Sequence, residues 1–146
     1  WRFVHEWFKK NKISTDKLVV LDTSPYETRE EADKQLVVLR NKDVNAKFKS
    51  PLLKELKQFC KKNKISFSCK DKFIIEKNKL REKEGLKPIS IGSTELGRIV
   101  MESNGQIQGS TLQIPTTGYH TVDETASVES IKAIIFILSS FYIKNF

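Results

Sequence analysis

The sequence predicts an α/β fold in three layers, with a mixed or mostly parallel sheet and helices on both faces. Two observations predict it. Short apolar runs typical of buried strands, residues 17–21 and 36–39, alternate with segments of helical periodicity. Such alternation favours a parallel or mixed sheet covered on both sides. At 146 residues, one domain over residues 1–146 is expected, long enough to bury a core.

The first half is predicted to contain two helices and two strands. Four apolar residues at helical spacing predict an opening helix that ends near Lys10: Trp1, Val4, Trp7 and Phe8. Residues 17–21 are expected to form a buried strand before the turn at residues 22–25, and residues 36–39 a second one. The charged residues 27–33 fit a loop or a helical turn. Ser50 and Pro51 mark a helix start, because a capping hydroxyl precedes proline at the first helical position.

The second half ends in a long apolar helix. Residues 65–68 alternate like a strand, and the charged residues 70–87 are expected to be an exposed excursion or a mobile loop. Residues 92–95 resemble a helix start, and residues 110–114 are expected to form a strand closed by Pro115. The last helix, residues 128–142, is apolar on two sides and is expected to be covered by another layer or a partner.

Composition restricts the partners and the location. The net charge is +8, but the lysines are scattered between Lys9 and Lys87 among acidic residues, which is typical of a solvated surface. Cys60 and Cys69 match no zinc-knuckle spacing, so reduced thiols in a cytoplasmic protein are expected. No signal peptide is recognised, and the apolar run 133–138 is far shorter than the roughly 20 residues that span a bilayer. No membrane partner is expected.

Asp22 and His120 are the candidate site residues. Asp22 follows a predicted buried strand, where open α/β sheets bind ligands, although the pattern alone favours an ordinary turn-forming aspartate. His120 lies in a polar turn between a predicted strand and the last helix, where its ring would be open to solvent. Taken alone, His120 also fits an ordinary polar loop residue. His5, inside the first predicted helix, is expected to be an ordinary helix residue with no role in a site.

Four stretches, in the right order, resemble the C-terminal half of the catalytic domain of the glutamyl and tetrahedral dizinc aminopeptidases. Residues 19–23 (VVLDT) are similar to the strand that ends in a zinc-binding aspartate. Residues 92–97 (GSTELG) resemble the Gly-Gly-Thr-Asp-Ala turn, with Glu95 in place of aspartate. Residues 114–120 (IPTTGYH) resemble Ile-Pro-Thr-Arg-Tyr-x-His, which carries the last zinc ligand, and Glu124 stands where that motif has a glutamate.

The resemblance implies a zinc exopeptidase-like fold and specific residue roles. Asp22 would bind one zinc and His120 the other, with cobalt or manganese as alternative metals. Glu124 would orient the loop or His120, and Glu95 and Arg98 would lie near the substrate. The implied activity is that of a metalloprotease, a hydrolase that removes N-terminal residues from peptides as a large homo-oligomer. Asp22 and His120 should then lie within roughly 10 Å of each other.

The family also needs a histidine, a bridging aspartate and a glutamate as ligands, and an adjacent glutamate as general base. In that family these residues precede the strand that leads to the aspartate matched by Asp22. The first 21 residues of this chain contain no such set, and the pair Glu30–Glu31 follows Asp22 instead of preceding it. No catalytic residue is therefore assigned, and the chain alone is expected to be inactive. It would be a piece of a longer enzyme, as Trp1 in place of an initiator methionine suggests, or an inactive relative used as a scaffold.

A different class of function remains open, namely a small basic α/β module that binds acidic partners or nucleic acid through residues 54–87. Single-strand readers need exposed aromatic side chains among the basic ones. This segment offers Phe59, Phe67 and Phe73, whose spacing suits a core better, so nucleic acid is not the expected partner.

Overall fold

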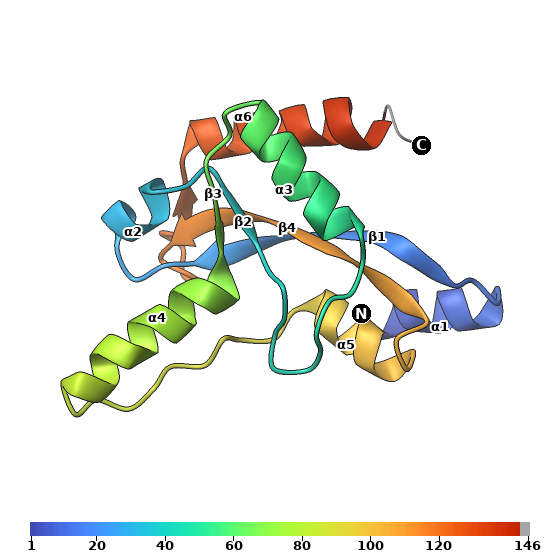
Figure 1. Cartoon of the computed structure of the whole chain (residues 1–146), viewed down its shortest axis with the longest axis horizontal. Coiled ribbons are helices and arrows are strands. Elements are labelled where there is room, and N and C mark those ends of the chain that lie inside the picture. The colour runs from blue at the N-terminus through green and yellow to red at the C-terminus, as the bar shows by residue number, and fades with distance from the viewer. Residues whose placement is uncertain (144–146) are drawn as a thin grey trace. The chain divides into compact units, whose positions relative to one another are not determined.

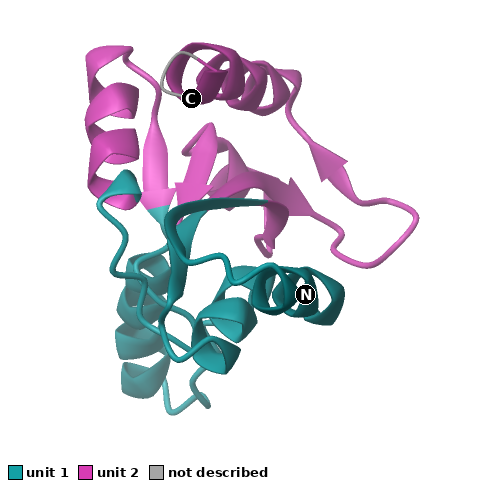
Figure 2. Ribbon diagram, turned by 90° about the vertical axis from the view of Figure 1, so that its right-hand side faces the viewer, with its two compact units in different colours: residues 1–20, 40–52, 69–110 teal, residues 21–39, 53–68, 111–146 magenta. Residues whose placement is uncertain are grey.

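The computed structural model describes residues 1–143, and contacts between residues divide the chain into two compact units (Figure 2). Unit 1 contains residues 1–20, 40–52 and 69–110. Unit 2 contains residues 21–39 and 53–68 and the chain from Thr111 onward. Two long strands contribute residues to both units. A single domain over the whole chain stays a prediction.

The strands form one mixed sheet in the described part of the chain (Figure 1). Its strands are β1 (Thr15–Pro25), β2 (Val37–Leu39), β3 (Phe67–Cys69), β4 (Ile107–Thr117) and β5 (Thr125–Ala126). The order is β1-β4-β2-β3, and β5 pairs with β4. Strand β2 runs antiparallel to β4, with Val38 opposite Gln113, and β5 is also antiparallel to β4.

Backbone hydrogen bonds show that β1 and β4 are parallel. The Thr15 N–H donates to the Gln106 carbonyl at 3.3 Å, and the Tyr26 N–H donates to the Thr116 carbonyl at 2.8 Å. Residue numbers therefore rise together along the two strands, as they do in a parallel pair. The predicted α/β class, a mixed sheet with helices on both sides, is confirmed.

Unit 1 contains helices α1 (Arg2–Lys10), α4 (Lys70–Lys83) and α5 (Glu95–Glu102). Both predicted helix starts at residues 1 and 92–95 are confirmed within a residue or two. Helix α5 supplies Leu96 and Val100 to a core cluster with Val20 and Phe48. Helix α1, by contrast, has no fully buried residue.

Helix α4 corrects the expected loop at residues 70–87. Its 14 residues lack apolar periodicity, but Lys, Glu, Arg and Leu are good helix formers. Its return segment is fixed by two hydrogen bonds between Asn78 and the backbone of Ile89, both 2.8 Å, and by a bond from Arg81 Nε to the Lys87 carbonyl at 2.8 Å. Polar contacts that the sequence pattern does not reveal therefore order this segment.

Two strands extend beyond their predicted ends. Strand β4 continues through Pro115 to Thr117 instead of closing at the proline. Strand β1 runs on to Pro25, and it is mostly not buried, since Leu21 is 54% exposed. It lies at one end of the strand order, with β4 as its neighbour, which explains why this apolar run is less covered than expected.

Unit 2 contains the short helix α2 (Arg29–Asp33), most of α3 (Leu52–Lys62), α6 (Val128–Ile137) and a π-helical turn, Leu138–Tyr142. The start of α3 is as predicted, because the Ser50 hydroxyl accepts a hydrogen bond from the Leu52 N–H at 3.1 Å. Helix α3 meets α6 and the π-helical turn through aromatic rings. The ring centre of Phe59 lies 5.9 Å from that of Phe136 and 5.3 Å from that of Phe141.

Helix α6 buries one side and leaves the other open in the described structure. Ala133, Ile134 and Ile137 are buried. The exposed apolar residues are Val128, Ile131, Ile135 and Phe136. The cover expected for the second face is thus not supplied by the described residues. In residues 1–143, moreover, no helix has the length and apolar character that crossing a membrane requires.

Candidate functional site

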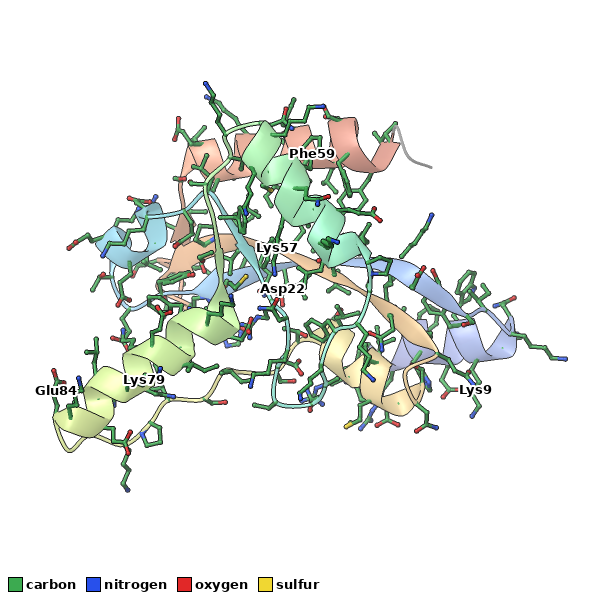
Figure 3. The ribbon with its side chains drawn as sticks, viewed as in Figure 1. Lys9, Asp22, Lys57, Phe59, Lys79 and Glu84 are labelled. Carbon is green, nitrogen blue, oxygen red and sulfur yellow. The ribbon has the colours of Figure 1, made fainter. Side chains whose placement is uncertain are left out.

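Asp22 lies on β1, with an exposed side chain that has spare hydrogen-bonding capacity (Figure 3). Its Oδ1 accepts a hydrogen bond from the Thr23 N–H at 2.8 Å. The side-chain amide of Gln113 donates a long hydrogen bond of 3.5 Å to Oδ2 and a shorter one of 2.9 Å to the Thr23 carbonyl. Asp22 is therefore inside an exposed stretch of strand, not beyond the end of a buried one, which corrects the sequence-based placement.

The loop after β4 has a tightly fixed backbone. Gly118 has φ +70°, and a Cβ there would lie 2.6 Å from the Asp123 carbonyl oxygen, so a larger residue does not fit. The Thr121 N–H and hydroxyl both donate to the Gly118 carbonyl, at 3.1 and 2.6 Å. The loop is consequently a defined turn that presents its next residues in one orientation.

His120 is held in this loop with φ +61°, in the left-handed region that few residues other than glycine adopt. Its exposed ring stacks on Tyr119, with ring centres 3.8 Å apart and planes at 23°. A strained backbone that persists because its surroundings fix it is often associated with a functional site. The exposed ring is free to offer a nitrogen to a ligand.

Glu124 contacts the backbone of His120. Its Oε2 accepts a hydrogen bond from the His120 N–H at 3.4 Å. Its Oε1 is buried and has no hydrogen-bond partner in the described structure. The carboxylate can therefore hold the loop, while a role toward a bound metal stays a prediction.

Asp22, His120 and Glu124 all belong to unit 2, but the described residues do not complete a metal site. In residues 1–143, no three His, Cys, Asp or Glu side chains gather in a way that could hold a metal ion. Two ligands do not hold a catalytic dizinc centre, so the residues present do not by themselves fit that group. The convergence of Asp22 and His120 stays a prediction.

Glu95 and Arg98 lie on α5, in unit 1. The Glu95 carboxylate is 3.6 Å from the amino nitrogen of Trp1. Arg98 Nε donates to the Ser93 hydroxyl at 3.2 Å, and its guanidinium lies 5.7 Å from the centre of the Trp1 ring. Both side chains are accessible, and their contact with a substrate stays a prediction.

Sequence analysis missed Asp43, a carboxylate only 5% exposed. It accepts hydrogen bonds from the Thr94 N–H at 2.7 Å, the Thr94 hydroxyl at 2.9 Å, the Asn45 N–H at 2.8 Å and the Ala46 N–H at 3.0 Å. An Asp two residues before Asn is a local signal for an Asx-turn. Nothing local indicates its partner 51 positions away.

The Asp43 carboxylate explains Gly97 in the stretch GSTELG. A Cβ on Gly97 would lie 2.0 Å from Asp43 Oδ2. The Thr94 hydroxyl also caps α5, since it accepts a hydrogen bond from the Gly97 N–H at 3.0 Å. In this chain the motif therefore anchors the start of α5 on a buried carboxylate.

Asp71 is a second buried carboxylate in unit 1, only 3% exposed. It accepts hydrogen bonds from the Asn41 N–H at 2.9 Å and from the Asn41 side-chain amide at 3.0 Å. Arg40, also buried, donates to the Ile91 carbonyl. The Asp71 bonds connect the residues after β2 with the start of α4, and the Arg40 bond connects them with the segment before α5, so both groups have a structural role.

Two of the three aromatic residues of the basic segment, Phe59 and Phe73, are engaged with other side chains. Phe59 lies between α3 and α6, as described above. The amines of Lys70 and Lys77 lie 5.2 and 5.7 Å from the centre of the Phe73 ring. Neither ring forms an open platform on which nucleic-acid bases could stack, so this segment offers little support for the binding module.

Comparison with solved structures establishes the class of fold. The chain is similar to PhTET1-12s, a tetrahedral aminopeptidase whose structure holds a dodecamer, with a TM-score of 0.57 and 16% sequence identity. The match covers 90% of this chain and 36% of that one, so the chain spans about a third of its neighbour's length. No family model and no curated protein matches the sequence. The likeness shows that the chain has the same kind of fold as the matched part of that structure.

Proposed function

We propose that the chain is the C-terminal part of the catalytic domain of a zinc-dependent aminopeptidase-like protein, a metallo-exopeptidase acting on peptide N-termini. It would supply Asp22 and His120 to a metal site completed by residues outside the 146. The observation that carries the proposal is His120, fixed in a left-handed conformation at the position of the family's ligand motif, in a chain with a peptidase-like fold.

The chemistry of the two side chains supports this role. A carboxylate oxygen and an imidazole nitrogen both suit zinc, and cobalt or manganese would be bound by the same groups. Asp22 keeps unused acceptor positions, whereas the buried Asp43 and Asp71 are occupied by backbone and amide donors. Asp22 is therefore the better placed of these three carboxylates to bind a metal.

Zinc titration calorimetry on the purified chain tests this role. The unchanged chain should bind zinc weakly, and Asp22→Asn and His120→Asn should each weaken binding at least tenfold, because even indirect support of a ligand is worth about 10–100-fold. His5→Asn is the matched control, since His5 is the other histidine of the chain, and it should leave binding unchanged. Equal effects of His5→Asn and His120→Asn would contradict the proposal.

The chain by itself should not cleave aminoacyl-anilide substrates with zinc present. The general base and three metal ligands have no counterpart in it, and without them the metal-bound nucleophile does not form. Cleavage above the metal-free background would show that the ligand assignment is wrong. Full-length protein that binds zinc through Asp22 and His120 but remains inactive would instead indicate a scaffold subunit.

Assembly and location belong to the same proposal. PhTET1-12s is a dodecamer, and α6 of this chain leaves apolar side chains exposed, so we expect a homo-oligomer. Sedimentation at micromolar concentration measures it, and a stable monomer would contradict it. Both cysteines are free thiols, which agrees with a cytoplasmic location that imaging of the tagged protein would test.

A further inference from the structure

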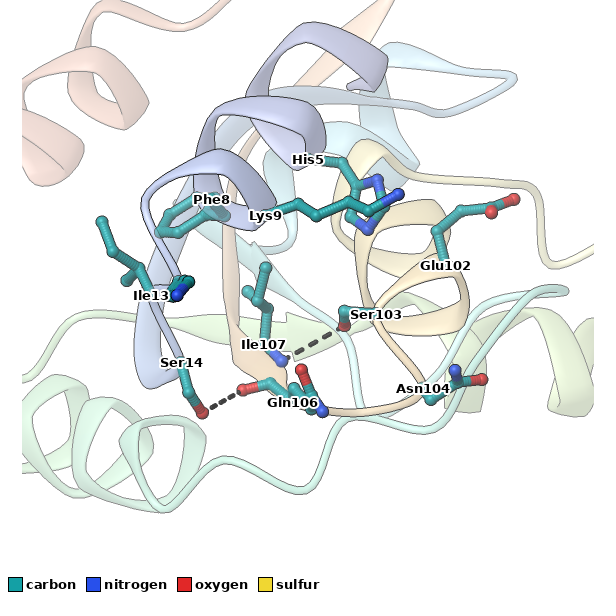
Figure 4. A pocket seen from close by; sticks show the side chains of 11 residues that line it. His5, Phe8, Lys9, Ile13, Ser14, Glu102, Ser103, Asn104, Gln106 and Ile107 are labelled. Atoms are coloured by element: carbon teal, nitrogen blue, oxygen red, sulfur yellow. Dashed lines mark hydrogen bonds between the residues drawn. The ribbon is translucent and has the colours of Figure 1, made fainter.

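A pocket of about 510 Å³ lies wholly within unit 1, between the C-terminal ends of α1 and α5 (Figure 4). Its volume falls within the roughly 300–1,000 Å³ typical of small-molecule sites. Neither Asp22 nor His120 lines it. This pocket is therefore distinct from the metal site proposed above, and ligand binding there does not depend on an aminopeptidase-like function.

The pocket wall formed by α1 has a fixed backbone. Ile13 N–H donates to the Phe8 carbonyl at 3.0 Å and Lys12 N–H donates to the Lys9 carbonyl at 3.1 Å, with Lys12 at φ +52°. These two bonds are those of a Schellman motif at a helix C-terminus. The motif commonly includes a hydrophobic contact between the two residues that correspond here to Phe8 and Ile13. Both line the pocket, so α1 contributes an apolar surface.

Helix α5 ends in the same pattern on the opposite wall. Gly105 N–H donates to the Val100 carbonyl at 2.8 Å and Asn104 N–H donates to the Met101 carbonyl at 3.1 Å, with Asn104 at φ +50°. Below it, Ile107 is only 3% exposed and completes the apolar floor. The pocket therefore lies between two rigid helix ends.

Charges of opposite sign line the two walls. Lys9 belongs to α1 and Glu102 to the end of α5, and both are labelled in Figure 4. Lys12, two residues after α1, also lines the pocket. In the part of the chain that the structure describes, none of the three forms an ion pair. Glu102 is the last residue of a helix with no basic residue in its last turn, so the helix dipole adds to its negative charge and favours a cation beside it.

We infer that this pocket binds a small zwitterion with an apolar side chain, namely a free apolar α-amino acid such as leucine. The ligand's carboxylate would lie beside Lys9 and Lys12, and its ammonium beside Glu102 and the last carbonyls of α5. Its side chain would cover Phe8, Ile13 and Ile107. A divalent cation does not fit, because the described residues offer no group of three metal-binding side chains.

The test is an NMR titration of the isotope-labelled chain with leucine up to about 20 mM, enough to detect millimolar affinity. The backbone amide signals of Ile13 and Asn104 should shift together and saturate. Leucinamide, which lacks the carboxylate, and N-acetyl-leucine, which lacks the ammonium, should each bind about threefold more weakly, as partly exposed ion pairs predict. Glycine, without an apolar side chain, should bind more weakly still.

Charge-removing variants test which side chain contacts the ammonium of leucine and which contacts its carboxylate. Glu102→Gln should weaken the binding of leucine about threefold and leave the binding of N-acetyl-leucine unchanged. Lys12→Gln should weaken the binding of leucine and leave the binding of leucinamide unchanged. Glu84→Gln and Lys83→Gln, exposed charges at the end of α4, are matched controls and should change nothing. Leucyl-leucine binding more tightly than leucine would assign the pocket to peptides instead of free amino acids.

Three results would overturn the inference. They are no saturating shift at Ile13 and Asn104 with leucine, equal binding of leucine, leucinamide and N-acetyl-leucine, and tighter binding of the dipeptide than of leucine. The comparison of ligands on the unchanged chain does not depend on any variant folding.

Discussion

Asp43 in unit 1 and Asp22 in unit 2 show two ways in which this chain uses a carboxylate. Asp43 is 5% exposed and accepts four close hydrogen bonds from the backbone and hydroxyl groups of its neighbours. Asp22 is exposed and accepts one close bond. A carboxylate saturated by fixed donors stabilises the fold, whereas one with free acceptor positions is available to a ligand. Variants of Gly97, Asp43 and Asp22 test this difference.

Gly97→Ala should have the largest effect, because it inserts a methyl group 2.0 Å from the Asp43 carboxylate. Displacing that carboxylate adds broken hydrogen bonds to the steric cost, so we expect a loss of about 3 kcal/mol in the free energy of unfolding, measured in urea. Gly85→Ala is the control: its φ is +70° but no atom lies within 4 Å of the added Cβ, so about 1 kcal/mol is expected. Equal losses would contradict the close contact.

Asp43→Ala should destabilise unit 1 by about 2–3 kcal/mol, since it leaves buried N–H groups of Thr94 and the Asn45 turn without an acceptor. Asp22→Ala should change stability by less than about 0.5 kcal/mol, as exposed positions usually do. Urea unfolding of both variants gives the comparison directly. If Asp22→Ala were the more damaging, Asp22 would be a structural residue and the metal proposal would lose its basis.

Alkaline pH should destabilise unit 2, because its core buries two groups that are uncharged at neutral pH, the Cys60 thiol and the Tyr142 hydroxyl. Burial raises the pKa of the Cys60 thiol to about 11, and burial, together with the charge of Cys60, raises the pKa of Tyr142. Because the folded-state pKa of Cys60 is the higher one, its contribution is complete below about pH 9 and is lost as pH rises toward 11. The expected loss is roughly 1–2 kcal/mol.

Urea unfolding at several pH values measures this loss, and Cys60→Ala should flatten the profile between pH 9 and 11. An unchanged slope in that variant would show that the thiol is not the titrating group.

Thr94→Ala should cost about 1 kcal/mol, less than Gly97→Ala or Asp43→Ala, because it removes the hydroxyl that caps α5 and donates to Asp43 but keeps the Thr94 N–H bond to Asp43. Thermal unfolding measures it. A loss as large as that of Asp43→Ala would mean that the cap, not the buried carboxylate, fixes the start of α5.

The sequence predicts the helix starts at Ser50 and Thr94 because capping depends on residues within one turn of each other. It predicts the buried strand β2 from a run of apolar residues. It does not predict helix α4, since the contacts that order α4, such as Asn78 with Ile89, are polar and lack periodicity.

The candidate site is predictable only where its signal is local. His120 and its glycine-containing loop are visible in the motif, but Asp43 and Gly97 meet across 54 positions and leave no joint pattern. Asp22 is found by resemblance, yet its position within an exposed strand depends on the place of β1 in the sheet, which a short apolar run does not reveal.

The most direct test of the account is whether Asp22 and His120 approach one metal site in solution. Paramagnetic Mn²⁺ can be titrated into the isotope-labelled chain while NMR signals are followed. The signals of Asp22 and His120 should broaden together at the lowest metal concentrations, because their side chains should lie within roughly 10 Å of each other. His120→Asn should abolish the broadening at Asp22. Broadening of only one of them, or of His5 before either, would contradict the account.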